Sequence, residues 1–158
     1  MDLEIQQDAA VFKSHWDAEK KLFVTRIHGL FDQSAVDNWQ QELIDQSKQI
    51  PAETQFNFLL DERGYTYQDK SVHKKKRDVV PQFLATYSFY LSILSEAEVR
   101  WLKKHIAIDE KHRHCLKIAM VHLNQTAMAD LQSNYGNESE LYGSDLKEAM
   151  KWLNQPSD

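Results

Sequence analysis

The clearest feature of the hydrophobic pattern is the stretch from Gln55 to Gly64, which reads Gln-Phe-Asn-Phe-Leu-Leu-Asp-Glu-Arg-Gly. Its apolar run is nearly continuous, too short for a helix and rich in aromatic rings. Such a run, ended by charged residues and a glycine, predicts a strand buried on both faces in the middle of a sheet. Because helices are expected on either side of it, we expect a site at its end, formed by Asp61, Glu62, Arg63 and Gly64.

Patterns of the same kind predict the elements around this strand. Two alternating runs, 11–16 and 22–28, flank a five-residue polar connection and indicate a β-hairpin. After Asp32 or Ser34, apolar residues recur at steps of three and four, which predicts an amphipathic helix that ends before the central strand. The inward side chains of that helix are expected to be Val36, Trp39 and Leu43.

The C-terminal part predicts a second buried strand over 116–123, followed by a short helix, an edge strand over 140–142 and a last helix capped by Ser144. The short helix would start at Asn124. Its inward residues would be Ala127, Leu131 and Tyr135. We expect the two buried strands to be neighbours, and Phe58, Leu60, Ile118 and Met120 to be core side chains on them.

The segment between these strands is the least regular part of the pattern. Residues 65–77 are polar and include the basic run His73-Lys-Lys-Lys-Arg77. The pattern becomes helical at Val79, with Pro81 in a first turn that tolerates proline. Ser95-Glu-Ala-Glu98 reads as a capping box that begins a second amphipathic helix. The two helices are expected to form an extended pair packed on the sheet.

This helical pair has more apolar surface than one-sided packing requires. The first helix presents Phe83, Tyr87 and Tyr90 among other large side chains, and Trp101 lies off the stripe of the second helix. Surplus apolar surface predicts self-association, or a ligand lid over the sheet, and of these we favour self-association. The aromatic residues could also line a small apolar cavity, although core packing or a dimer contact explains their number with fewer assumptions.

Composition narrows the class of protein. The chain has 158 residues, 42% of them hydrophobic, a length and composition that fit one domain over 1–158. Its formal net charge of −5 argues against nucleic-acid binding. A single cysteine, Cys115, excludes an internal disulfide framework. The first residues do not read as a signal peptide, and no apolar run is long enough to span a membrane, so we expect a cytoplasmic protein.

The order of elements and three local motifs resemble the STAS domain family, which includes anti-sigma-factor antagonists. The motifs are Ile27-His-Gly-Leu-Phe-Asp32, the lysine-led strand Lys117-Ile-Ala-Met-Val121, and the ending from Glu138 to Leu153. The resemblance covers 11–64 and 116–153. It implies an α/β mixed sheet with flanking helices, and a regulatory, non-enzymatic protein.

The chain departs from the STAS pattern at the strand end. Signalling members carry Asp-Ser-Ser-Gly or a relative there, and the first serine is phosphorylated by a partner kinase, whereas this chain has Asp61-Glu-Arg-Gly64. Glu62 cannot accept phosphate, so we expect no phosphorylation switch at this position. Glu62 could instead resemble the charge of a phosphoserine. The simpler interpretation is strand-end polarity, with Arg63 paired to a neighbouring acid.

Other candidate chemistry is weaker. His112-Arg-His114-Cys115 contains zinc-ligand types, but no second Cys/His pair stands at zinc-finger spacing, so we expect no metal. The basic run 73–77, with Lys103, Lys104, Lys111 and Arg113, could form a surface for an acidic partner or phosphate, although charge runs are usually solvated. Phosphate loops, nucleophile elbows and zinc-protease helices are missing, so we expect neither an enzyme nor a cofactor.

The sequence therefore predicts a single-domain α/β protein that resembles STAS domains and acts as a regulatory or protein-interaction module. Its partner would be another protein or a second copy, bound through the helical pair. The alternative is a carrier of a small apolar molecule or lipid, with the helical pair as a lid, and a small enzyme is the third hypothesis.

Overall fold

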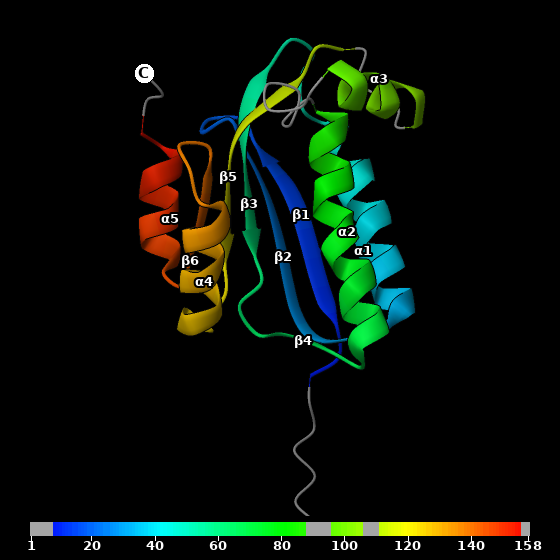
Figure 1. The fold of residues 1–158 in the computed structure, drawn as a ribbon, viewed down its shortest axis with the longest axis vertical. Coiled ribbons are helices and arrows are strands. Elements are labelled where there is room, and N and C mark those ends of the chain that lie inside the picture. The colour runs from blue at the N-terminus through cyan, green and yellow to red at the C-terminus, as the bar shows by residue number, and fades with distance from the viewer. Residues whose placement is uncertain (1–7, 88–95, 106–110, 156–158) are drawn as a thin grey trace, which may run out of the picture.

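The computed structural model describes residues 8–87, 96–105 and 111–155 (Figure 1). Within them, a mixed six-stranded sheet is flanked by helices, as predicted. The strands are β1 (Val11–Asp17), β2 (Leu22–Phe31), β3 (Gln55–Asp61), β4 (Tyr65–Tyr67), β5 (His114–Val121) and β6 (Glu140–Gly143). The helices are α1 (Gln33–Ser47), α2 (Lys70–Thr86), α3 (Glu96–His105), α4 (Gln125–Tyr135) and α5 (Leu146–Leu153).

The strand order is β1-β2-β3-β5-β6, with β4 paired to the end of β2. β1 and β2 form the predicted antiparallel hairpin, and the other pairings are parallel. Phe58 lies opposite Ile118, and Leu60 opposite Met120, so the predicted adjacency of the two buried strands is confirmed. Because β2, β3, β5 and β6 follow one another across the sheet in chain order, the sheet has no strand-order reversal of the kind that usually opens a ligand crevice.

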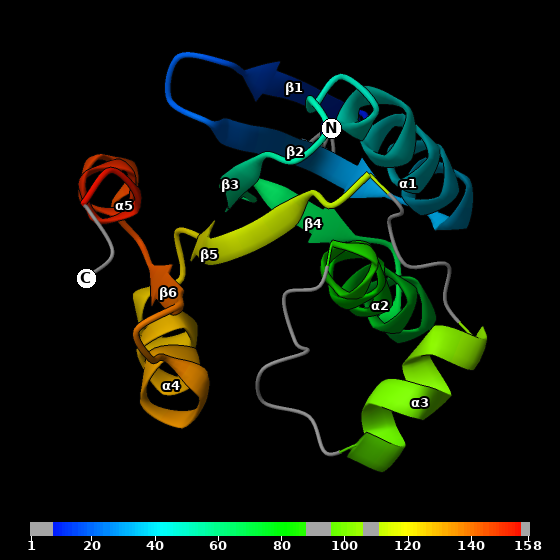
Figure 2. The ribbon, with the colours of Figure 1, turned by 90° about the horizontal axis from the view of Figure 1, so that it is seen from above.

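Helices cover the two faces of the sheet unequally. α1 and α2 lie over one face, α5 lies over the other, and α4 lies beside the edge strand β6 (Figure 2). The face under α1 and α2 holds the larger core, whose biggest fully buried side chains are Trp39, Phe23, Phe31, Phe56 and Phe58. The face under α5 holds a smaller core built from Leu22, Val24, Leu59, Ala119, Val121, Ala149 and Leu153.

Two polar contacts hold α5 against the sheet. The Asn57 amide donates to the Leu153 carbonyl at 2.8 Å, and the Lys117 ammonium donates to the Gln155 carbonyl at 3.1 Å. Leu153 is the last residue of α5, where helix carbonyls have no partner within the helix, and Gln155 follows two residues later. A lysine there also opposes the partial negative charge of the helix end.

Four of the described helices begin at a capping side chain. Asp32, Asp69, Asn124 and Asp145 each accept a hydrogen bond from the backbone N–H three residues later, at 2.8–3.2 Å. Asp32 is one of the two caps predicted for α1, and Asn124 is the predicted start of α4. The last helix is capped by Asp145 and not by Ser144, because the aspartate side chain is the one that reaches the exposed N–H groups.

The predicted start of α2 at Val79 is wrong. The helix begins at Lys70, so the basic run is helical and Pro81 lies well inside the helix, not in its first turn. Val72 and Lys76 are buried with Val79, which places the charged segment on the same packed stripe as the apolar one. Pro81 is exposed, so the Arg77 carbonyl, which loses its helical donor at this proline, can be hydrated.

Smaller differences concern three further elements. Tyr135 was expected to face inward from α4 but is 60% exposed, and Met128 is the buried residue of that helix. β4 was not predicted. α3 lies beyond the C-terminal end of α2 and runs across it, so it is α2 that covers the sheet, and α3 does not pack on the sheet beside it as was expected of the pair (Figures 1 and 2). The expected capping residue Ser95 lies outside the described residues.

Candidate functional site

The candidate site is the strand-end turn, Asp61 to Gly64, which joins β3 to β4. β2 pairs with β3 up to Arg26 and with β4 from Gly29 onward, so two residues of β2 face three residues of the turn. The turn is therefore a one-residue bulge. Gly29 and Gly64 both have positive φ values, of +88° and +82°, and the Gly29 N–H donates to the Gly64 carbonyl at 2.9 Å. Asp61 ends β3, and the alternation of side chains along the strand places the next residue, Glu62, on the opposite face of the sheet.

Asp61 and Arg63 form an ion pair on the face of the sheet where α5 lies. The Arg63 guanidinium donates to both carboxylate oxygens, at 2.8 and 2.9 Å, and Arg26 approaches the same carboxylate at 3.6 Å. Burial acts to raise the pKa of Asp61, but the hydrogen bonds from Arg63 and the charges of Arg63 and Arg26 together outweigh it and lower that pKa. The pairing of Arg63 with a neighbouring acid, the simpler of the two interpretations of the sequence, is therefore present.

Glu62 and Lys76 form a second ion pair, on the face that α2 covers. Both residues are buried, with 4% and 5% exposure, and the Lys76 ammonium contacts the Glu62 carboxylate directly. The same ammonium lies 4.8 Å from the centre of the Tyr65 ring. The Glu62 N–H also donates to the Val121 carbonyl at 2.9 Å. Because the carboxylate is buried and paired, it does not offer a surface charge like that of a phosphoserine.

Tyr65 and His73 extend this buried group toward the surface. The Tyr65 hydroxyl lies 3.3 Å from His73 Nδ1, and the half-exposed Tyr67 ring stacks on the imidazole at 4.3 Å. Burial and the charge of Glu62 raise the pKa of Tyr65, which keeps the phenol protonated and able to donate. Burial, followed by the charges of Lys76 and Arg77, lowers the pKa of His73, which favours a neutral imidazole as the acceptor.

The lowered pKa of His73 predicts a pH-dependent stability. The unfolded chain takes up this proton near pH 6.5 and the folded chain only at lower pH, so protonation favours unfolding. The contribution of neutral His73 to the free energy of unfolding should be fully present above about pH 6.5, the unfolded pKa. It should be lost as the pH falls from there through the lower folded pKa. Urea denaturation at about pH 7.5 and about pH 5.5 measures the decline, and His73→Gln should reduce it. An unchanged decline in His73→Gln would contradict the assignment, whereas the Asp61 contribution is lost only at much lower pH.

The other predicted site residues do not join this turn. Phe83 and Tyr87 are buried in the larger core, where Phe83 lies 5.5 Å from Phe23 and Tyr87 lies 5.4 Å from Phe56, measured between ring centres. Trp101 is 57% exposed on α3. Tyr90 lies outside the described residues. The sequence thus singled out residues in three separate places: a strand-end turn, a core and a surface helix.

The sequence analysis missed two buried basic residues that connect separate elements of the fold. Lys76 was treated as part of a solvated run, and Arg113 as a contributor to a basic surface, but both are buried. Arg113 donates to the carbonyls of Ser47, the last residue of α1, and of Ile50, which follows the helix, at 3.1 Å each. Its guanidinium lies 5.2 Å from the centre of the Tyr87 ring. The spacing of Lys76 was the available signal. Lys76 lies four residues after Val72 and three before Val79, which places it on the same face of the helix as these two apolar residues.

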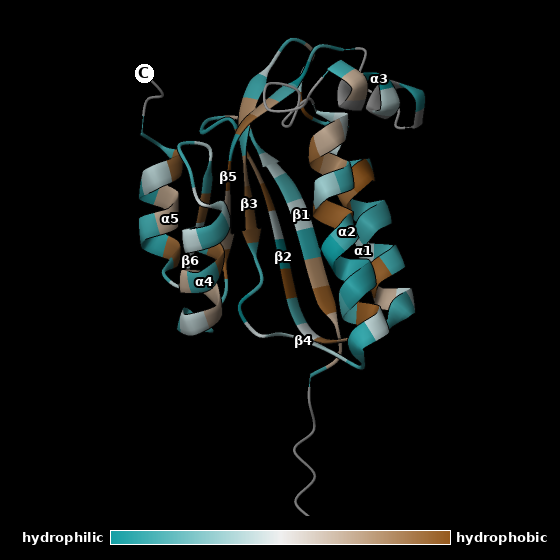
Figure 3. Cartoon of the chain, viewed as in Figure 1, coloured by the Kyte–Doolittle hydropathy of each residue, from teal (hydrophilic) through white to brown (hydrophobic). Residues whose placement is uncertain are grey.

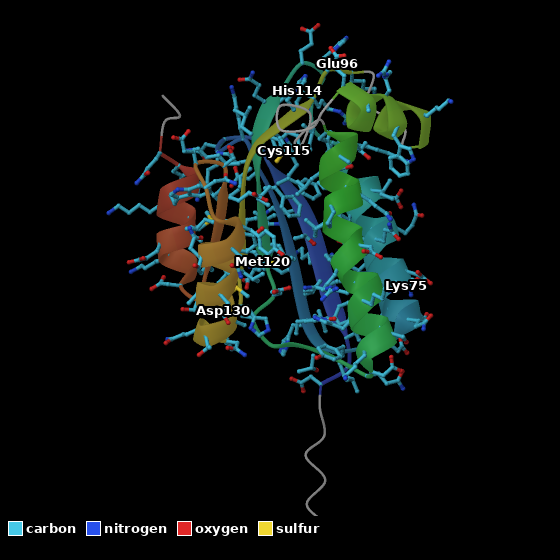
Figure 4. The ribbon with its side chains drawn as sticks, viewed as in Figure 1. Lys75, Glu96, His114, Cys115, Met120 and Asp130 are labelled. Carbon is cyan, nitrogen blue, oxygen red and sulfur yellow. The ribbon has the colours of Figure 1, made fainter. Side chains whose placement is uncertain are left out.

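Neither a candidate metal cluster nor a membrane-spanning helix is found among the described residues. No cluster of three or more histidine, cysteine, aspartate or glutamate side chains among them could hold a metal ion. His114 and Cys115 lie at the amino end of β5, away from the strand-end turn (Figure 4), and burial raises the pKa of the Cys115 thiol. None of the helices in these ranges is long and apolar enough to cross a membrane.

Comparisons with family models, with curated proteins and with solved structures gave no match to this chain. The resemblance to STAS domains therefore stays a prediction from the sequence.

Proposed function

We propose that the chain is a non-enzymatic regulatory or protein-binding module. The observation that carries the proposal is the pairing of every charged side chain of the strand-end turn: Asp61 with Arg63, and Glu62 with Lys76. A general acid or base must reach the proton it transfers, and both carboxylates are buried in ion pairs. The raised pKa of the nearby Tyr65 phenol likewise opposes a nucleophilic role. These charges serve to hold the turn in shape.

The contact surface in this proposal is α3, which lies at the opposite end of the sheet from the strand-end turn (Figure 1). Trp101 is 57% exposed there, and the neighbouring Glu96, Ala97, Arg100 and Lys104 are exposed as well. Tryptophan is enriched among the residues that dominate binding energy at protein interfaces. We favour self-association through α3, with a different protein as the second kind of partner.

The carrier alternative has less support. It required Phe83 and Tyr87 to line a cavity for an apolar ligand. Their rings instead pack against each other at 4.9 Å and against Phe56 and Phe58 at 5.4 Å each. These contacts are those of core aromatic residues.

The self-association proposal is tested with Trp101→Glu and light scattering at micromolar concentrations. The wild-type chain should form dimers or larger species, and the variant should associate at least about tenfold more weakly, because a charge replaces the aromatic contact. The matched control is Leu123→Glu, which places the same charge at a 63% exposed apolar residue after β5. A wild-type chain that stays monomeric throughout would contradict the proposal.

A further inference from the structure

We propose that the solvent-facing side of α2 binds a short acidic segment of a protein partner. The surface consists of Lys70, Lys74 and Arg77, which we call the basic stripe. This inference rests on the proposed binding function but uses a surface separate from α3. Figure 3 shows the first turns of α2 as largely hydrophilic on their outer side.

The cations of α2 divide into two groups. Lys75 pairs with Asp37 of α1, and Lys76 pairs with the buried Glu62, so these two serve the packing of the helix. The basic stripe follows an i, i+4, i+7 spacing, which places its three side chains in one row along the helix. All three residues are exposed, and none forms an ion pair with another described residue.

Lys70, the first residue of the stripe, occupies an electrostatically unfavourable position on the helix. The N-terminal end of a helix carries a partial positive charge and favours acidic residues. The first turn of α2 contains no acidic residue, and Lys70 occupies it. Asp69 provides the capping carboxylate, and the effect of the helix end falls off within the first turn, so it acts on Lys70 and not on Lys74 or Arg77. Since Lys70 does not help the helix to form and no described acid forms an ion pair with Lys74 or Arg77, we assign the three charges to recognition.

The size of the stripe favours a protein segment over a nucleic acid. Seven residues of helix rise only about 10 Å, which matches a few acidic side chains of one peptide. Nucleic-acid binding generally recruits more phosphate contacts, and the net charge of −5 would repel a long polyanion. Beside the stripe, Tyr67 stacks on His73 and is 43% exposed, so an apolar side chain of the same partner could pack there.

The experiment measures binding of a fluorescein-labelled hexaglutamate peptide by fluorescence anisotropy at low and physiological salt. The stripe variant is Lys70→Gln/Lys74→Gln/Arg77→Gln. It should bind at least about tenfold more weakly than the wild type, because three ion pairs of a few-fold each are lost together. Its midpoint of thermal unfolding should be unchanged or higher by up to about 2 °C, since the helix loses the unfavourable charge of Lys70.

The matched control is Lys20→Gln/Lys48→Gln/Lys151→Gln, which removes the same charge from exposed lysines outside α2. It should bind the peptide like the wild type. Equal loss in both triple variants, or no binding by the wild type, would overturn the proposal. Tighter binding of a labelled oligothymidylate through the same stripe would overturn the choice of a protein partner. Failure here would leave the light-scattering result for Trp101→Glu unchanged, so the two proposals fail separately.

Discussion

Replacing Lys76 with alanine should lower the free energy of unfolding by about 3–5 kcal/mol. The substitution leaves the Glu62 carboxylate buried between α2 and the sheet without its counter-charge. A buried unpaired charge costs far more than the pair itself contributes. Guanidinium denaturation at neutral pH, with the slope checked for a two-state transition, gives this difference.

Two controls separate the buried pair from an ordinary ion pair. Lys75→Ala removes a lysine from the neighbouring position, where its pair with Asp37 is partly exposed, and should cost less than about 1 kcal/mol. The double variant Glu62→Gln/Lys76→Met removes both charges and should recover most of the stability lost in Lys76→Ala. If Lys76→Ala were no more harmful than Lys75→Ala, the buried pair would not be what holds the turn.

Truncation of Phe58 to alanine should cost about 3–5 kcal/mol, as for other large aromatic core residues. Phe58 is 1% exposed, and its ring lies 6.2 Å from that of Phe23 and 5.4 Å from that of Phe83. The cavity left between β3, β2 and α2 cannot close without moving these rings. Chemical denaturation measures the loss, and Leu116→Ala is the control.

Leu116 lies on the neighbouring strand β5 but is 38% exposed, so its truncation should cost less than about 1 kcal/mol. A cost for Phe58→Ala as small as that for Leu116→Ala would contradict the central position of β3. Because Phe58 and Phe83 are in contact, a Phe58→Ala/Phe83→Ala double variant should deviate from the sum of the single effects.

Hydrophobic periodicity predicted most of the sheet. β2, β3 and β5 are read correctly because their apolar runs are long and bounded by polar or glycine residues. α1 is predicted because its stripe is regular and Asp32 offers a clear cap. These elements build both cores, so the fold class follows from signals that lie within each segment.

The errors in α2 and β4 have a common cause, which is that the deciding contact lies far away in the sequence. Lys76 of the basic run pairs with Glu62, fourteen residues earlier; its spacing from Val72 and Val79 is a local signal for the buried stripe, but no local pattern shows its partner. β4 has only three residues and exists because the end of β2 is available to it. The alternation of polar and apolar residues cannot be recognised in a strand of three residues.

The place of the candidate site was predicted better than its chemistry. Residues 61–64 were selected because a buried strand ends there, and they do lie at the end of β3. Alternation along β3 places Asp61 and Glu62 on opposite faces of the sheet, but Lys76, the partner of Glu62, lies on a helix fourteen residues later. The sequence holds no local sign of that contact, so the partner of Glu62 could not be deduced, whereas the pairing of Arg63 with a neighbouring acid was already one of the interpretations.

The measurement that tests the proposed binding function most directly is hydrogen–deuterium exchange of the wild-type chain at low and high micromolar concentration. If the chain associates through α3 and uses its strand-end turn as scaffold, peptides covering 96–105 should gain protection at the higher concentration. Peptides covering 61–64 should exchange equally at both. Protection that appears at the turn and not on α3, or that appears nowhere, would contradict the account.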